Sequence, residues 1–134
     1  MKLIADTGFI LARWSKSQAR RAWAVRYLEN AELPFLTAEA NLLEAGWRLG
    51  RPELAPRLLK DGDYISKLAI SEHAGELLWL VNKYADREMD IADTCIVRLA
   101  ELNPDATILT TDKADFSVYR TRAGAKLRCD FGPD

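Results

Sequence analysis

Four acidic side chains lie where the predicted secondary structure would bring them to one edge of a sheet. Asp6 directly follows a short apolar run, and Asp112 directly follows the predicted strand that ends in Thr110-Thr111. Asp93 falls in the first turn of a predicted helix, and Glu44 lies inside a helix that follows another predicted strand. Parallel strands end at the same edge of a sheet, and ligands bind in the crevice outside that edge. We therefore expect these four carboxylates to converge on one site.

Carboxylates gathered in this way predict a metal-dependent chemistry. With no counter-charge, they would repel one another by several kcal/mol or take up protons. A hard divalent cation with oxygen ligands, Mg²⁺ or Mn²⁺, removes that repulsion. Such a cation also lowers the pKa of a bound water and neutralises charge on a phosphoryl oxygen. The four acids therefore predict phosphodiester hydrolysis that uses neither a histidine nor a nucleophilic serine.

Each acid also has a purely structural interpretation. Asp93 could cap its helix, although Asp90 is better placed for that role. Glu44 could pair with Arg48 one helical turn further on. Asp112 could begin a turn. The ordered set supports a common site more strongly than any one of its members.

Other catalytic chemistries lack the residues they need. His73 is the only histidine, which excludes paired-histidine catalysis and histidine-based zinc sites. The sequence contains no nucleophile elbow, no nucleoside-triphosphate phosphate loop and no dinucleotide-binding glycine turn. Cys95 stands beside Ile96 and Val97 in a predicted helix, where a thiol packs rather than reacts.

Length and composition predict one domain over residues 1–134. The chain is 49% hydrophobic and 29% charged, which excludes intrinsic disorder. The longest apolar run, Leu77–Val81, is too short for a membrane helix, and Asp6 interrupts what would be the apolar stretch of a signal peptide. The two cysteines have no metal-binding spacing and fit a reducing compartment. We expect a cytoplasmic protein without a membrane segment.

Charge is distributed unevenly although the formal net charge is −1. Residues 1–32 hold six basic and three acidic side chains, and residues 116–134 hold four and two. The segment between them holds nine basic and fifteen acidic side chains. Basic flanks around an acidic centre suit a protein that binds a polyanion, and solvated helix faces explain the same pattern equally well.

Hydrophobic periodicity predicts alternating strands and helices. The strands are expected at Lys2–Ala5, Pro34–Leu36, Tyr64–Ile70, Ala106–Thr111 and Lys126–Phe131. The helices are expected at Phe9–Trp14, from a Ser17 cap to Leu28, from a Thr37 cap through Ala38–Leu49, from Pro52 to about Lys60, from Ser71 to about Ala85, and at Ile91–Leu102. This alternation predicts an α/β fold, a three-layer α/β/α sandwich with a mainly parallel sheet of about five strands.

Four segments together resemble the PIN-domain nucleases, and most closely the VapC-type toxins of toxin–antitoxin pairs. They are Asp6–Leu11, Asn41–Glu44, Asp90–Thr94 and Thr110–Phe116. Each motif is short, but the ordered set is fairly specific and the likeness spans the whole chain.

The resemblance implies an endoribonuclease that depends on Mg²⁺ or Mn²⁺. By matching motif, Asp6, Glu44, Asp93 and Asp112 would ligate the metal and position the attacking water. Thr7 and Thr110 would support them through hydroxyl hydrogen bonds, and Asp115 would assist as an outer acid. Basic side chains would hold the RNA through its phosphates; the candidates are Arg13, Lys16, Arg20 and Arg120.

The resemblance also implies two protein partners, an antitoxin that covers the cleft and a second copy of the chain. The chain has four tryptophans, which could pack in the core or contribute to such an interface. Three other functions remain open at this stage. They are a structure-specific DNA or RNA nuclease, a non-catalytic adaptor that binds nucleic acid or protein, and a receiver-type regulatory module, for which Asp6-Thr7 lacks the adjacent second acid.

Overall fold

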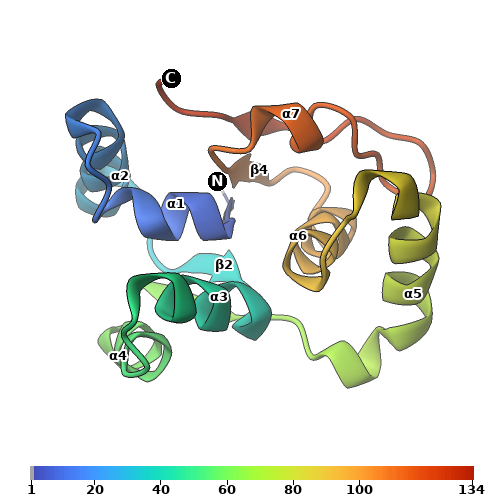
Figure 1. Cartoon of the computed structure of the whole chain (residues 1–134), viewed down its shortest axis with the longest axis horizontal. Coiled ribbons are helices and arrows are strands. Elements are labelled where there is room, and N and C mark those ends of the chain that lie inside the picture. The colour runs from blue at the N-terminus through green and yellow to red at the C-terminus, as the bar shows by residue number, and fades with distance from the viewer. Residues whose placement is uncertain (1) are drawn as a thin grey trace.

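Five short strands form one parallel sheet in the computed structural model, which describes residues 2–134 (Figure 1). The sheet order is β3-β2-β1-β4-β5, and every neighbouring pair is parallel. The strands are β1 (Leu3–Ala5), β2 (Phe35–Thr37), β3 (Tyr64–Ser66), β4 (Thr107–Leu109) and β5 (Cys129–Asp130). The expected five-stranded sheet is confirmed, with β1 at its centre.

The register of β1 and β4 brings two distant parts of the chain together. Ala5 is paired with Leu109, so Asp6 and Thr110 leave the sheet next to each other. The Asp6 amide donates to the Leu109 carbonyl at 3.0 Å, which fixes this arrangement at the carboxyl edge of the sheet.

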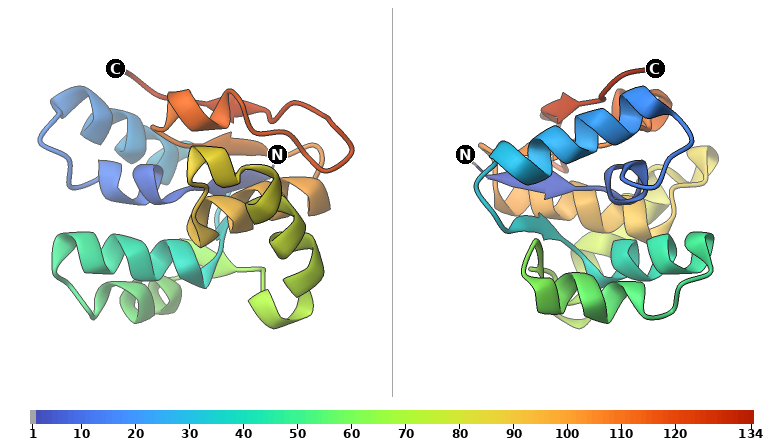
Figure 2. Two further views of the ribbon diagram at one scale, coloured as in Figure 1. Left: turned by 45° about the vertical axis from the view of Figure 1, so that its right-hand side comes forward. Right: turned by 90° about the vertical axis from the view of Figure 1, so that its left-hand side faces the viewer.

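Helices lie on both faces of the sheet (Figures 1 and 2). Two single-turn 3₁₀ helices, Ile70–Glu72 (η1) and Ala85–Arg87 (η2), flank α5. The α-helices are α1 (Thr7–Ala12), α2 (Gln18–Asn30), α3 (Glu39–Leu49), α4 (Leu54–Asp61), α5 (Ala74–Lys83), α6 (Ile91–Leu102) and α7 (Lys113–Phe116). Within residues 2–134, none of these helices combines the length and the apolar character that crossing a membrane requires.

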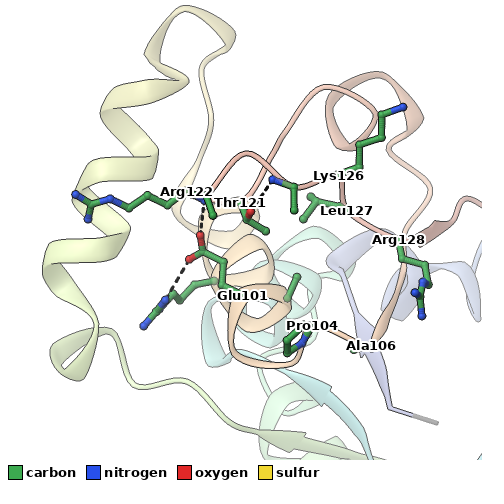
Figure 3. Close-up of a pocket in the computed structure, with 12 residues that line it drawn as sticks. Glu101, Pro104, Ala106, Thr121, Arg122, Lys126, Leu127 and Arg128 are labelled. Carbon is green, nitrogen blue, oxygen red and sulfur yellow. Dashed lines mark hydrogen bonds and ion pairs between the residues drawn. The ribbon is translucent and has the colours of Figure 1, made fainter.

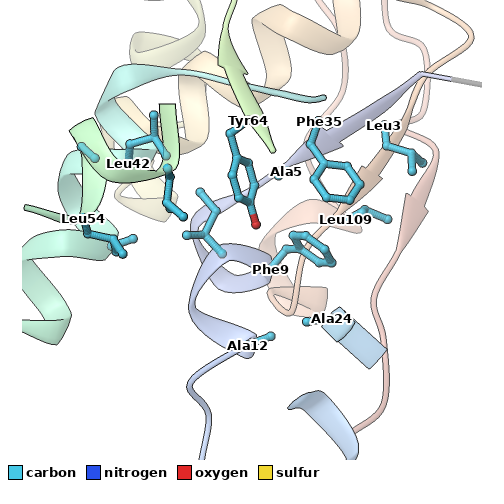
Figure 4. Close-up of a cluster of buried hydrophobic side chains, with 14 of the residues drawn as sticks. Leu3, Ala5, Phe9, Ala12, Ala24, Phe35, Leu42, Leu54, Tyr64 and Leu109 are labelled. Atoms are coloured by element: carbon cyan, nitrogen blue, oxygen red, sulfur yellow. The ribbon is translucent and has the colours of Figure 1, made fainter. Parts of the chain in front are cut away.

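Two hydrophobic cores account for the three layers. Side chains alternate between the two faces of a strand. Leu3, Ala5 and Leu109 therefore pack with α1, α2, α3 and α4 on one face (Figure 4), while Ile4 and Ile108 pack with α5 and α6 on the other. The predicted α/β/α sandwich is thus confirmed.

Local signals in the sequence set several helix ends. The Ser17 hydroxyl accepts from the Arg20 amide at 3.2 Å and caps α2, as expected. Gly50, with φ of 65°, ends α3 in the left-handed region that favours glycine. Asp90 Oδ1 accepts from the Asp93 amide at 2.8 Å and caps α6. These three predictions are confirmed.

The predicted strand Tyr64–Ile70 is wrong beyond Ser66. Its neighbour β2 ends at Thr37, whose carbonyl accepts from the Lys67 amide at 3.1 Å, so residues after Lys67 find no strand to pair with, and the chain turns into η1 at Ile70. The following helix begins at Ala74 rather than at Ser71, because residues 70–72 form η1. The strands expected at 106–111 and 126–131 are likewise shorter than predicted.

The structure differs from the sequence predictions at two further places. Thr37 does not cap α3, because its hydroxyl donates to the Ala5 carbonyl at 2.8 Å and Ala38 takes the cap position. The short helix α7 was not predicted. It begins after Asp112, whose Oδ1 accepts from the Asp115 amide at 3.0 Å.

Candidate active site

An acidic cleft of about 330 Å³ lies at the carboxyl edge of the sheet. It contains all four acids expected to converge, together with three more. Two arginines, Arg48 and Arg87, also line it. The acids are Asp6, Glu44, Glu88, Asp90, Asp93, Asp112 and Asp115.

Asp6 forms the buried floor of the cleft. Its Oδ2 accepts from the Thr110 hydroxyl at 2.6 Å, and its Oδ1 accepts from Asn41 Nδ2 at 3.2 Å. Burial raises the pKa of Asp6 to about 6, the Thr110 hydrogen bond opposes this rise, and the nearby Asp112 and Glu44 add to it. Two donors therefore hold a carboxylate that its surroundings would otherwise protonate.

Asn41 is a supporting residue that the sequence analysis did not single out. It is fully buried on α3, and its Nδ2 also lies 3.1 Å from the Thr7 hydroxyl. Its Oδ1 is buried and has no hydrogen-bond partner among the described residues. Turning the amide over would place that oxygen against the Asp6 carboxylate, so support of Asp6 fixes the orientation. Its position three residues before Glu44 on the same helix was the available signal.

Asp93 projects into the cleft from the first turn of α6. Because Asp90 supplies the helix cap, the Asp93 carboxylate is free for another role. Its Oδ2 accepts from the hydroxyl of Tyr119, a fully buried residue, at 3.1 Å. Burial raises the pKa of Asp93 to about 8, and the neighbouring Asp6 and Asp90 carboxylates contribute to the rise.

The tightest grouping of acids is Asp93, Asp112 and Asp115. One carboxylate oxygen from each lies within 4.8 Å of the other two. Burial raises the pKa of Asp112 as well. Asp115, expected as an outer acid, therefore stands in the grouping, whereas Asp6 and Glu44 line the same cleft outside it.

Glu44 occupies the side of the cleft formed by α3. Its Oε2 lies 3.3 Å from Arg48 Nη2, one helical turn further on. The ion pair between Glu44 and Arg48, which the structural interpretation of Glu44 predicts, is therefore present, and Glu44 also lines the cleft.

Thr110 connects two of the acids. Its hydroxyl donates to Asp6 and accepts from the Asp112 amide at 3.1 Å. Across the cleft floor, α1 begins very close to the residue after Thr110. A Cβ on Gly8 would lie 2.2 Å from Thr111 Oγ1, so this approach requires glycine.

Thr110→Val is expected to destabilise the protein by about 1–2 kcal/mol near pH 7, because a buried carboxylate loses its shortest hydrogen bond. Valine keeps the shape of threonine, so little packing is lost. Urea denaturation measures the effect, with Thr110→Ser as the matched control that keeps the hydroxyl. Equal losses in the two variants would contradict this role for the hydroxyl.

The donor set fits a hard divalent cation. Every ligand offered by the grouped residues is a carboxylate oxygen, and the seven acids of the lining outnumber its two arginines.

The basic residues at the cleft are not those expected from the sequence. Arg13, Lys16, Arg20 and Arg120 are absent from its lining. Arg120 Nη1 instead donates to the carbonyls of residues 117–119 at 2.9–3.0 Å. The Arg13 guanidinium lies 5.3 Å from the centre of the Trp14 ring. Arg48 and Arg87 are the basic residues that line the cleft with the acids, and the sequence did not predict this.

Two other cavities lack converging chemical groups. In one of about 520 Å³, Arg122, Lys126 and Arg128 point in different directions (Figure 3). In another of about 720 Å³, the Asp130 carboxylate is already bonded by Trp23 and Tyr27. Both are larger than the acidic cleft, so the choice of site rests on chemistry rather than on size.

The tryptophans divide between core and surface. Trp23 is buried, whereas Trp47 on α3 is 83% exposed, close in sequence to Leu43, which is 63% exposed.

Searches against protein-family models and against curated protein sequences find no match to this chain.

Proposed function

We propose that this protein is a Mg²⁺- or Mn²⁺-dependent endoribonuclease of the PIN-domain type. The observation that carries the proposal is the approach of Asp93, Asp112 and Asp115 to within 4.8 Å of one another in a cleft that the buried Asp6 also lines. These residues come from the motifs that resemble the PIN-domain nucleases, and the sequence alone predicts that four acids of the cleft converge on one site.

Different residues of the chain would have different roles at such a site. Asp93, Asp112 and Asp115 would hold the cation, with Asp6 and Glu44 completing the negative field around it. A divalent cation there would lower the pKa of a water molecule and neutralise charge on a phosphoryl oxygen. Thr110 fixes Asp6, and Tyr119 fixes one oxygen of Asp93. The carboxylates thus stay oriented without rearrangement of the backbone.

Proton transfer at this site would fall to carboxylates and water. His73 does not line the cleft, and its Nδ1 accepts from Arg98 at 3.3 Å. No cysteine lines the cleft either, within the part of the chain that the structure describes. The described residues therefore favour metal-assisted hydrolysis over attack by a side-chain nucleophile.

The toxin assignment, with its cytoplasmic location and its partners, extends this proposal through the resemblance. An antitoxin would cover the cleft, and a second copy of the chain would form a homodimer. The exposed Leu43 and Trp47 support a protein partner, because they project from α3, the helix that carries Glu44 into the cleft. Exposed tryptophan and leucine side chains are suited to burial at an interface.

Purified protein is expected to cut RNA internally when Mn²⁺ is present and to stop when EDTA is added. Gel analysis of a structured RNA, an unstructured RNA and a branched DNA tests this directly, with Asp6→Asn as the inactive control. Cleavage of the DNA alone would favour a structure-specific DNA nuclease. Binding without any cleavage would favour a non-catalytic adaptor.

A further inference from the structure

Arg87 lies at the edge of the acid grouping and points its guanidinium at one member. Its Nε and Nη2 lie 3.2 and 2.9 Å from Asp115 Oδ1, and Nη2 also donates to the Ala114 carbonyl at 3.2 Å. Both bonds to the carboxylate end on the same oxygen, so the other oxygen of Asp115 takes no part in the pair. Arg87 therefore fixes Asp115 while leaving it able to bind a cation.

The same contacts leave part of the guanidinium unused. An arginine side chain carries five N–H donors in a planar fork. Nε and Nη2 account for the contacts given above, and Nη1 makes no hydrogen bond to the described residues. The two N–H groups of Nη1 therefore stay available, and Arg87 is one of the residues that line the cleft.

The backbone holds Arg87 in this position from both sides. Tyr84 and Met89, which flank the segment, are buried, and the Arg87 amide donates to the Tyr84 carbonyl at 3.0 Å. Glu88, the next residue, has φ of 56°, in the left-handed region that non-glycine residues rarely adopt. Such strained residues persist where the surrounding structure determines them, often at ligand sites. Arg87 is thus presented by a short, anchored turn.

An acidic cleft needs a cationic side chain if it is to bind a polyanion, and Arg87 is such a side chain. A nucleic-acid backbone is a polyanion, and seven acids line this cleft against two arginines. No aromatic side chain appears in that lining, so bases have no stacking platform there. Arg48, the other arginine, is paired with Glu44 one turn earlier on α3, and its side chain is more exposed than that of Arg87. Phosphate oxygens are the groups of such a polyanion that a cationic side chain binds best, and Arg87 has free donors and is paired with one of the grouped acids.

We propose that Arg87 binds a non-bridging phosphate oxygen of the RNA backbone next to the bond that is cut, through Nη1, while Nε and Nη2 hold Asp115. This inference rests on the proposed function and adds a substrate-binding residue to it. Arginine suits the task because its planar fork can serve a carboxylate and a phosphate at once.

Arg87→Gln is expected to weaken RNA binding about tenfold, since one charge-assisted contact is lost. The test uses a fluorescein-labelled single-stranded RNA of mixed sequence and an Asp6→Asn background, so that binding is measured without cleavage. The slope of log affinity against log salt should become shallower by about 0.7, the value for one phosphate on a single strand. Arg87→Lys should restore the salt slope and only part of the affinity.

Metal binding separates this role from a structural one. Removing a cation beside the acids should leave Mn²⁺ binding unchanged or tighter, as measured by the Mn²⁺ concentration that raises the melting temperature. A disrupted fold would weaken both ligands together, so weaker Mn²⁺ binding by Arg87→Gln would overturn the proposal.

Arg57→Gln is the matched control, because Arg57 is an exposed arginine on α4 outside the cleft. If Arg87→Gln binds RNA like Arg57→Gln, with the same salt slope, the role of Arg87 is wrong while the nuclease proposal stands. If wild-type protein cuts no RNA and the Asp6→Asn parent binds none, both fail together.

Discussion

Asp93→Asn is expected to lower the rate of Mn²⁺-dependent RNA cleavage by about 10²–10³-fold. The substitution keeps the size and shape of the side chain but removes a charge from the acid grouping. It also replaces the carboxylate that accepts from Tyr119, so the remaining oxygen is held less firmly. Initial rates at saturating Mn²⁺ and saturating RNA measure the loss in kcat.

The control for this experiment is Asp86→Asn. Asp86 is an exposed acid in η2, near the cleft in sequence but absent from its lining. Its substitution should leave kcat unchanged. A wild-type rate for Asp93→Asn would remove the acid grouping from the reaction.

The second large effect concerns stability, and its sign changes with metal. Asp6 and Asp93 have pKa values raised to about 6 and about 8, mainly by burial. Their folded forms therefore bind protons more tightly than the unfolded chain does. The stabilisation from these protons is complete below about pH 4 and is lost as the pH rises through 6 and then 8. Without metal, we expect the free energy of unfolding to fall by about 3 kcal/mol between pH 5 and pH 8, allowing for partial solvent screening at Asp93.

Asp93→Asn should remove most of this pH dependence and should make the metal-free protein more stable than wild type at pH 8. Mn²⁺ at about 100 times its dissociation constant should stabilise wild type by about 2.7 kcal/mol and the variant far less. Thermal denaturation of wild type and of Asp93→Asn, in EDTA and in Mn²⁺ at pH 5 and at pH 8, measures the pH dependence and the metal stabilisation of each protein. A wild-type melting temperature that is independent of pH and of metal would show that the acids neither share a site nor bear a burial penalty.

The fold could be predicted because its signals are local. Short apolar runs between helical periodicities predicted every strand of the sheet, and Ser17, Gly50 and Asp90 set helix ends through contacts with their own neighbours. Strand lengths could not be predicted in this way. The extended segment after Ser66 reads as strand in sequence, and it leaves the sheet only because β2 has ended.

Some residues of the candidate site could likewise be predicted from the sequence, and others could not. Asp6 and Asp112 stand beyond strands that lie next to each other, so strand order alone brings them close. Asn41 stands one helical turn before Glu44, so helical spacing could have indicated it. Arg87 and Tyr119 reach the acids through tertiary contacts that no sequence periodicity predicts. Arg87 is followed by a left-handed residue, Glu88, and Tyr119 lies in the turn after α7.

The bond between Thr110 and Asp6 joins positions 104 residues apart. A chain still emerging from the ribosome carries Asp6 long before Thr110, Asp112 or Asp115 have been translated. The cleft cannot be assembled on such a nascent chain, because β4 must first insert beside β1. The cleft is therefore complete only after synthesis has passed α7, and translation itself delays its assembly.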